Sequence, residues 1–87
     1  MSKIQKTLLK ILTGTSDHNI DFDEAIKVLE YFGFSLRIKG SHHIFYREDI
    51  KEIINIQPNG TKAKAYQIKQ IRNIILQYKL SDKFNNE

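Results

Sequence analysis

The 87-residue sequence predicts an α+β fold, in which a three-stranded antiparallel sheet has two helices packed on one face. Three observations predict it. Apolar residues recur at three-and-four spacing from Phe22 to Phe32, alternate with polar residues between Phe34 and Gln57, and return to helical spacing over about 63–78. Helices that flank a meander in sequence can pack side by side on one face of its sheet, which leaves the other face open to solvent or a ligand.

Two helices are predicted before the first strand. Residues 3–12 carry apolar side chains at helical spacing between lysines, and the turn formers of 13–19 form a loop that exposes His18. The second helix begins at Asp21, whose carboxylate can accept hydrogen bonds from the first-turn amides, while Glu24 can reach back as in a capping box. Gly33 supplies the left-handed residue that ends this helix. How the first helix packs is left open.

The three strands are predicted over 34–39, 42–47 and 51–57, with a turn at Gly40-Ser41 and another at Glu48-Asp49. The first strand has an apolar face and a basic face, and the third places Ile54 and Ile56 on one face. In the second strand one face holds His42, Ile44 and Tyr46, and the other holds His43, Phe45 and Arg47. Periodicity does not decide which of these two sets faces the core.

The closing segment completes a fold of the double-stranded-RNA-binding-domain type, with the order α-β-β-β-α and an extra N-terminal helix. The loop at 58–61 contains a proline and Asn-Gly, and the final helix follows over about 63–78. Leu80 is expected to pack on the core. We expect one domain, with 1–20 as helix and loop, 21–80 as the core and 81–87 as a flexible tail anchored only by Phe84.

Charge is distributed unevenly along the chain. The net charge is +4, yet no Asp or Glu occurs between Ile53 and Ser81, a segment with five lysines and arginines. Such a segment attracts RNA or DNA, or it is a solvated helix face that keeps the protein soluble. The chain has no cysteine, no recognisable signal peptide and no apolar run long enough to span a membrane, so we expect a soluble cytoplasmic protein without a membrane partner.

The absence of several known motifs narrows the kinds of reaction that the protein could catalyse. The sequence has no GxxxxGK[ST], GxGxxG, HExxH or nucleophile-elbow motif. His42 and His43 are neighbours on a strand and point to opposite faces, so they cannot both ligate one ion, and we expect neither a metal nor another cofactor. An imidazole beside basic residues suits RNA cleavage, because it can take a proton from a ribose 2′-hydroxyl or return one to the leaving oxygen. The alternative is a histidine that only hydrogen-bonds or packs within the sheet.

A helix ends in Gly33-Phe34 and is followed by a strand, and Gly40-Ser41-His42 then precedes a second strand. A proline-containing loop and a helix with spaced isoleucines complete the pattern. This order of elements and motifs resembles the HicA (YcfA-like) toxins of type II toxin–antitoxin systems. The resemblance covers about 22–80. It implies a small mRNA interferase with a double-stranded-RNA-binding-like fold, neutralised by a HicB antitoxin that covers the active face. It also implies that His42, directly after Gly-Ser, is the catalytic residue.

The remaining site residues follow from this assignment. We expect five residues to bind RNA: Arg37, Lys39, Ser41, Lys62 and Lys64. His43 and Gln57 are expected to be accessory, and His43 could equally be structural. The family commonly has Pro-x-His after the third strand, whereas this chain has Gln57-Pro58-Asn59-Gly60, so either His42 acts alone or Gln57 and a lysine substitute. The alternatives are a non-catalytic RNA-binding domain and a module that only docks an acidic antitoxin.

Overall fold

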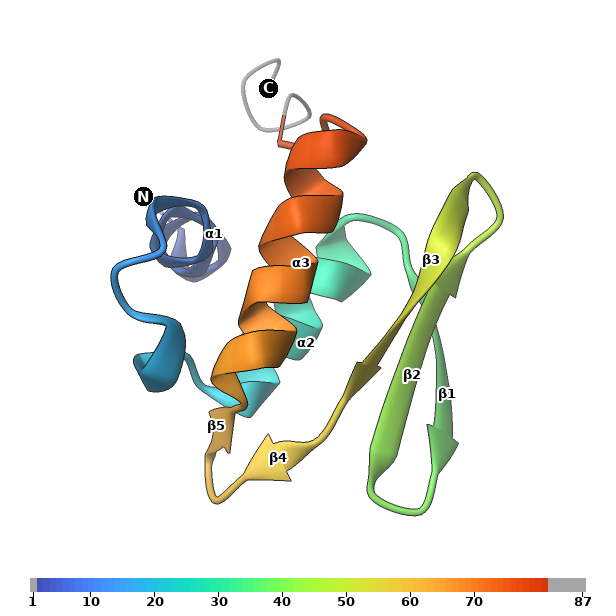
Figure 1. Ribbon diagram of the computed structural model, residues 1–87, viewed down its shortest axis with the longest axis horizontal. Helices are drawn as coiled ribbons and strands as arrows, with labels where there is room; N and C mark the ends of the chain where they lie inside the picture. The colour runs from blue at the N-terminus through green and yellow to red at the C-terminus, as the bar shows by residue number, and fades with distance from the viewer. Residues whose placement is uncertain (1, 82–87) are drawn as a thin grey trace.

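The computed structural model describes residues 2–81, and it confirms the predicted order of helices and strands (Figure 1). The helices are α1 (Lys3–Thr13), the short 3₁₀ helix η1 (Asp17–Asn19), α2 (Phe22–Tyr31) and α3 (Ala65–Gln77). The main sheet contains β1 (Ser35–Lys39), β2 (His42–Arg47) and β3 (Ile50–Ile56). The sequence did not predict the small hairpin of β4 (Pro58–Asn59) and β5 (Lys62–Ala63), which connects β3 to α3.

The sheet has the strand order β1-β2-β3, and its register settles which face of β2 is buried. Phe45 pairs with Ile54, and both are fully buried beneath the helices. Consequently His43 and Phe45 face inward, whereas His42, Ile44 and Tyr46 lie on the outer side. Burying the ring of Phe45 removes more apolar surface from water than burying the smaller Ile44 would, which accounts for the choice of face.

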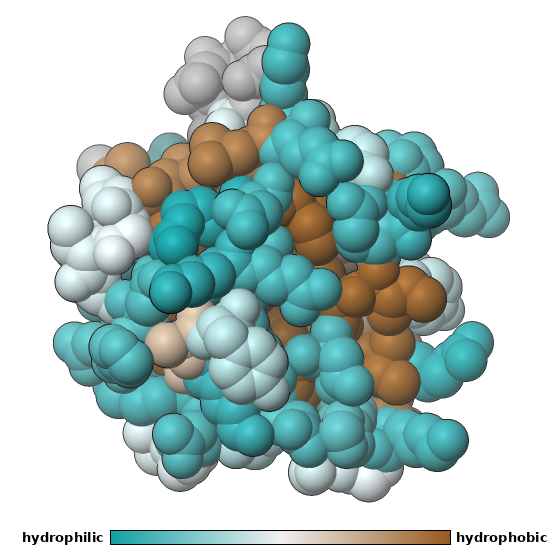
Figure 2. All heavy atoms as spheres, in the orientation of Figure 1, coloured by the Kyte–Doolittle hydropathy of each residue, from teal (hydrophilic) through white to brown (hydrophobic). Residues whose placement is uncertain are grey.

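The apolar side of β1 is less buried than its alternating pattern suggests. Leu36 is 37% exposed and Ile38 is 59% exposed. In Figure 1, β1 lies on the far side of β2 from α3, at the edge of the sheet. In Figure 2 most of the visible surface is hydrophilic, and apolar surface appears over the sheet and along the upper part of the helices.

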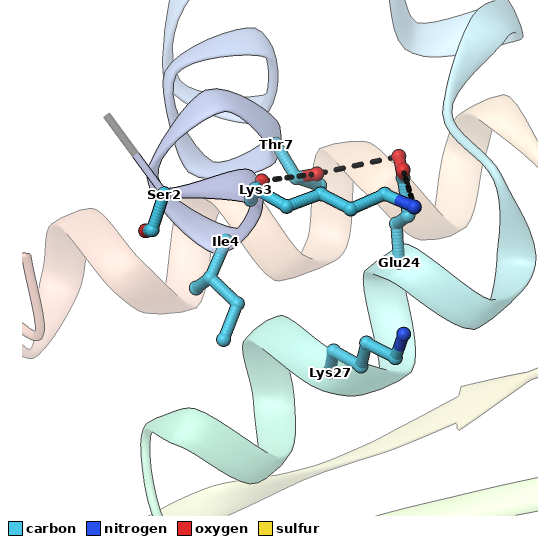
Figure 3. Close-up of a pocket in the computed structure, with 6 residues that line it drawn as sticks. All are labelled: Ser2, Lys3, Ile4, Thr7, Glu24 and Lys27. Carbon is cyan, nitrogen blue, oxygen red and sulfur yellow. Dashed lines mark hydrogen bonds and ion pairs between the residues drawn. The ribbon is translucent and has the colours of Figure 1, made fainter.

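Helix α1 packs against α2 and α3, and its buried residues Leu8 and Ile11 join the core. Polar contacts also join α1 to α2: the Thr7 hydroxyl lies 3.3 Å from a Glu24 carboxylate oxygen, and the Lys3 ammonium lies 3.5 Å from the other (Figure 3). The capping box predicted at Asp21 and Glu24 is therefore wrong, because Glu24 turns toward α1 and Asp21 makes no side-chain cap. A capping box does occur at Ser2 and Gln5.

A largely buried ion pair connects the N-terminal segment to α3. Arg72 Nη1 and Nη2 donate to the two carboxylate oxygens of Asp17 at 2.9 and 3.3 Å, and Nη1 also donates to the Ile11 carbonyl at 3.1 Å. Gly14, with φ of 71°, ends α1 beside this guanidinium. These contacts place α1 and η1 against the final helix.

The two ends of the core follow the sequence prediction. Gly33 has φ of 84° just after the last turn of α2, and Leu80 packs against the core. The Tyr78 hydroxyl donates to the Glu52 carboxylate, which holds the end of α3 to β3 and raises the pKa of Tyr78 above its ordinary value. The tail prediction, including Phe84, concerns residues that lie outside the described part apart from Ser81.

Candidate active site

His42 opens β2 on the side of the sheet that faces away from the helices, which we call the open face. The open face carries side chains from all three strands: Arg37, Lys39, His42, Ile44, Tyr46, Ile53 and Asn55. Lys39 is the cross-strand partner of His42, and directly paired residues place their side chains next to one another. The imidazole is half-buried, so it is both held by protein groups and accessible to solvent.

Two amide side chains hold the His42 ring from opposite sides. Nδ1 lies 3.1 Å from Asn55 Oδ1, and Nε2 lies 3.0 Å from Gln57 Nε2. An amide oxygen only accepts and an amide nitrogen only donates, so the two contacts together require Nδ1–H to donate to Asn55 and Nε2 to accept from Gln57. This arrangement selects the neutral tautomer whose lone pair is on Nε2.

Gln57 is itself fixed by two neighbours. Its side-chain oxygen accepts from Lys64 Nζ at 3.4 Å, which leaves its amide nitrogen for His42. Its backbone N–H donates to Gln67 Oε1 at 3.1 Å, and Gln67 is almost fully buried at the start of α3. A chain of contacts thus runs from α3 through Lys64 and Gln57 to the imidazole.

His43 has a different environment from its neighbour. Its ring packs edge-on against Phe22 of α2, with centroids 4.9 Å apart and an interplanar angle of 83°. Its Nδ1 lies 3.4 Å from the Ser41 carbonyl. His43 therefore contacts the helical side of the sheet and does not join the Asn55 and Gln57 contacts around His42.

Four of the five residues predicted to bind RNA lie near His42, in two groups. Arg37 and Lys39 lie on the open face with His42, and the Arg37 guanidinium is 5.7 Å from the centre of the Tyr46 ring. Ser41 is exposed in the turn before His42. Lys64 is connected to the His42 ring through the side chain of Gln57.

Lys62 is the exception among the predicted cations. Its ammonium donates to Asp21 at 2.7 Å, and this hydrogen bond and the charge behind it lower the pKa of the Asp21 carboxyl below its ordinary value of 3.8. Asp21 thus offsets the charge of Lys62 at the start of α2. The structure therefore brings together four of the five predicted cationic and hydroxyl groups, whereas Lys62 holds β5 to the start of α2.

Sequence reasoning missed Asn55 and Gln67. The alternation of β3 placed Asn55 on the face away from Ile54, but only the strand register puts it opposite Ile44 and within hydrogen-bond distance of His42. Gln67 had no sequence signal, because a polar residue on a helix is usually exposed. Its position in the buried row of α3 becomes informative only once the packing is known.

Within residues 2–81, no three His, Asp or Glu side chains gather where they could hold a metal ion. The helices of that part are too short or too polar to cross a membrane.

An α+β sandwich that covers one sheet face and leaves a basic, histidine-bearing face open belongs to the double-stranded-RNA-binding-like class. A profile of the family described as the HicA toxin of bacterial toxin–antitoxin systems matches residues 22–79. The chain belongs to the HicA toxin family, and it is thus the toxin of a toxin–antitoxin pair whose partner is an antitoxin. Comparisons with curated proteins and with solved structures gave no significant match.

Proposed function

We propose that this toxin is a metal-independent endoribonuclease that cuts mRNA, with His42 as its general acid and base. The observation that carries the proposal is the geometry of the imidazole. The ring is half-exposed on a basic face, and Asn55 and Gln57 hold it in the tautomer whose Nε2 is unprotonated. A neutral imidazole in this tautomer can act as a base at Nε2 once the Gln57 amide gives way to the substrate.

The reaction begins when a ribose 2′-hydroxyl takes the place of the Gln57 amide at Nε2. As the 2′-oxygen attacks the adjacent phosphorus, its proton moves to Nε2, and Asn55 continues to accept from Nδ1–H of the imidazolium. The P–O5′ bond then breaks, and the same ring returns the proton to the leaving 5′-oxygen. The products are a 2′,3′-cyclic phosphate and a 5′-hydroxyl, so atoms and charge balance without another reactant.

Cations on the open face supply the electrostatic part of this reaction. Lys39 is the cross-strand neighbour of His42, and Arg37 lies two residues earlier on the same face. Positive groups placed beside a phosphate stabilise the charge that develops on its oxygens in the transition state. Ser41 precedes His42 in the turn and Lys64 contacts Gln57, so both would contact the neighbouring backbone of the RNA.

The family commonly has Pro-x-His after the third strand, whereas this chain has Gln57-Pro58-Asn59-Gly60 and no histidine there. Gln57 lies directly before the proline. It contacts Nε2 directly and is oriented by Lys64, so we assign it to positioning the neutral ring before the RNA arrives. This role needs no proton exchange by Gln57. The single ring of His42 then carries both proton transfers, and His43 serves packing against Phe22.

We further propose that the antitoxin is of the HicB type and covers the open face. Ile53 is 60% exposed there and Tyr46 is 38% exposed, beside the cations Arg37 and Lys39. A partner with acidic and apolar side chains complements such a surface, because charge guides the encounter and aromatic or apolar anchors supply affinity. Covering this face would also block access to His42.

The test compares three purified proteins on single-stranded mRNA in excess EDTA. The wild type should cut, His42→Ala should not, and His43→Phe should cut like the wild type because it keeps an aromatic ring against Phe22. Equal cutting by the wild type and His42→Ala would remove the mechanism. RNA that binds in a salt-dependent way but stays intact with every variant would instead establish the alternative function, a non-catalytic RNA-binding domain.

A further inference from the structure

An open hollow of about 610 Å³ lies beside the candidate active site, between the loop that follows α1 and the beginning of α3. Helix η1 and the first turn of α3 form its two sides, and they lie next to one another in the fold (Figure 1). The residues that matter for its chemistry are Gly14, Asp17, His18, Lys64, Tyr66 and Lys69. We call it the flanking hollow.

The flanking hollow has an excess of positive charge. Lys64 and Lys69 both line it. The carboxylate that also lines it, Asp17, is already neutralised by Arg72 at 2.9 Å. The two lysines therefore face a hollow whose lining carboxylate is already paired, which favours a ligand that carries phosphate.

The hollow also contains an aromatic ring that the core does not use. Tyr66 is 63% exposed at the start of α3, although burying its ring would normally be favourable. The exposed imidazole of His18 lies on the opposite side, in η1. An exposed aromatic ring between cations is the combination that binds single-stranded nucleic acid, where the ring stacks on a base and the cations contact the backbone.

One residue belongs to both sites. Lys64 lines the flanking hollow and also donates to Gln57, whose amide contacts the His42 ring at 3.0 Å. An RNA strand bound at His42 can thus continue directly into the hollow. The notch of about 290 Å³ between α1 and α2 differs in this respect, because Lys3 and Glu24 pair across it and it is lined by α1, α2 and Ser2 (Figure 3).

We propose that the flanking hollow binds an unstacked nucleotide of single-stranded RNA next to the nucleotide that is cleaved at His42. This inference rests on the proposed ribonuclease function. It gives the N-terminal segment a part in substrate recognition, because residues 14–18 precede the family match that begins at residue 22. Tyr66 stacks on the base, and Lys64 and Lys69 contact the phosphates on either side.

The binding test uses a short fluorescent single-stranded RNA and fluorescence anisotropy, with every protein carrying His42→Ala so that the RNA stays intact. Adding Tyr66→Ala should weaken binding by about 5- to 150-fold, the range of a lost base–aromatic stack. Tyr66→Phe should restore it, because the ring remains. Leu76→Ala is the matched control, since it removes a side chain that is 56% exposed on the same helix and lies outside the hollow.

Salt dependence tests the phosphate contact separately. Lys69→Gln should reduce the slope of log K against log salt by about 0.7, the value for one contact to a single strand. Lys27→Gln, on α2, should leave the slope unchanged. If Tyr66→Ala and Lys69→Gln bind as their controls do, the flanking hollow is not an RNA site.

Cleavage by the corresponding proteins with His42 intact distinguishes this inference from the function it rests on. If the wild type cuts RNA and Tyr66→Ala cuts it with an unchanged KM, only the flanking hollow is refuted. If the wild type cuts no RNA while binding still depends on Tyr66, the proposed reaction is refuted and the binding site stands. A several-fold rise in KM for Tyr66→Ala, absent from Leu76→Ala, supports both.

Discussion

Replacing Arg72 with alanine should destabilise the protein more than any exposed charge substitution. Arg72 is 18% exposed and its partner Asp17 is 9% exposed, so the change leaves a carboxylate largely buried without a counter-ion. It also removes the donor to the Ile11 carbonyl. Breaking a buried pair from one side costs about 3–5 kcal/mol, and the residual exposure of Arg72 places this one near 3 kcal/mol.

In a domain of this size, a loss of about 3 kcal/mol lowers Tm by roughly 12–24 °C. Urea and thermal unfolding followed by far-UV circular dichroism would measure it, in a His42→Ala background to avoid toxicity. Arg37→Ala is the matched control and should cost less than about 1 kcal/mol, because Arg37 is exposed and its contact with the Tyr46 ring lies at the surface. The double variant with Asp17→Ala should lose clearly less than the sum of the single losses.

A loss for Arg72→Ala no larger than that of Arg37→Ala would refute this reasoning. So would additive losses in the double-mutant cycle, because they would show that the two side chains do not interact. Hydrogen exchange should locate the effect, with protection falling first in α1 and η1, the elements that Arg72 holds against α3.

Three further predictions concern acid stability, ring orientation and a glycine. Lys62 lowers the pKa of Asp21 below 3.8, so the pair stabilises the fold fully above about pH 4, and this stabilisation is lost as pH falls through the lowered pKa. The urea midpoints of the wild type and Lys62→Met should therefore converge only in strong acid. Asn55→Leu should lower kcat for RNA cleavage about tenfold with little change in KM, because the acceptor for His42 Nδ1–H is lost. Nitrogen NMR should then show a mixture of imidazole tautomers. An unchanged tautomer and rate would contradict the role of Asn55 in selecting the tautomer. In urea unfolding, Gly14→Ala should lower the free energy of unfolding by more than the roughly 1–2 kcal/mol expected for Gly33→Ala. Both glycines have a positive φ, but only a Cβ at position 14 meets a guanidinium nitrogen, at 3.2 Å. Equal losses would refute this crowding.

The sequence was sufficient to predict the three long helices and the three strands of the main sheet, because each has a clear local signal, whereas the short β4–β5 hairpin and η1 were expected to be loops. The isoleucines of α3, the alternation of β3 and Gly33 at the end of α2 all specify local structure without knowledge of the fold. The direction in which β2 faces was not predictable, since His42 and His43 begin two equally plausible faces. It is set by Phe45 packing against Ile54, a contact between strands that no local pattern encodes.

The candidate site was predictable only at its centre. The Gly40-Ser41-His42 resemblance identified the imidazole, and the basic face of β1 identified Arg37 and Lys39 as its neighbours. Asn55 was missed because its importance comes from strand register, and the pairing of Lys62 with Asp21 was not foreseen because it joins residues far apart in sequence. Side chains that act through long-range contacts leave little trace in a single sequence.

The most direct test of the proposed mechanism is the chemistry of the RNA ends left after cleavage in excess EDTA. Transfer of the 2′-hydroxyl proton to His42 Nε2 predicts a 5′-hydroxyl on one fragment and a 2′,3′-cyclic phosphate on the other. It also predicts that a 2′-deoxy substitution at the cleaved nucleotide prevents cutting. Fragments with a 5′-phosphate and a 3′-hydroxyl, or cutting at the deoxy position, would contradict it.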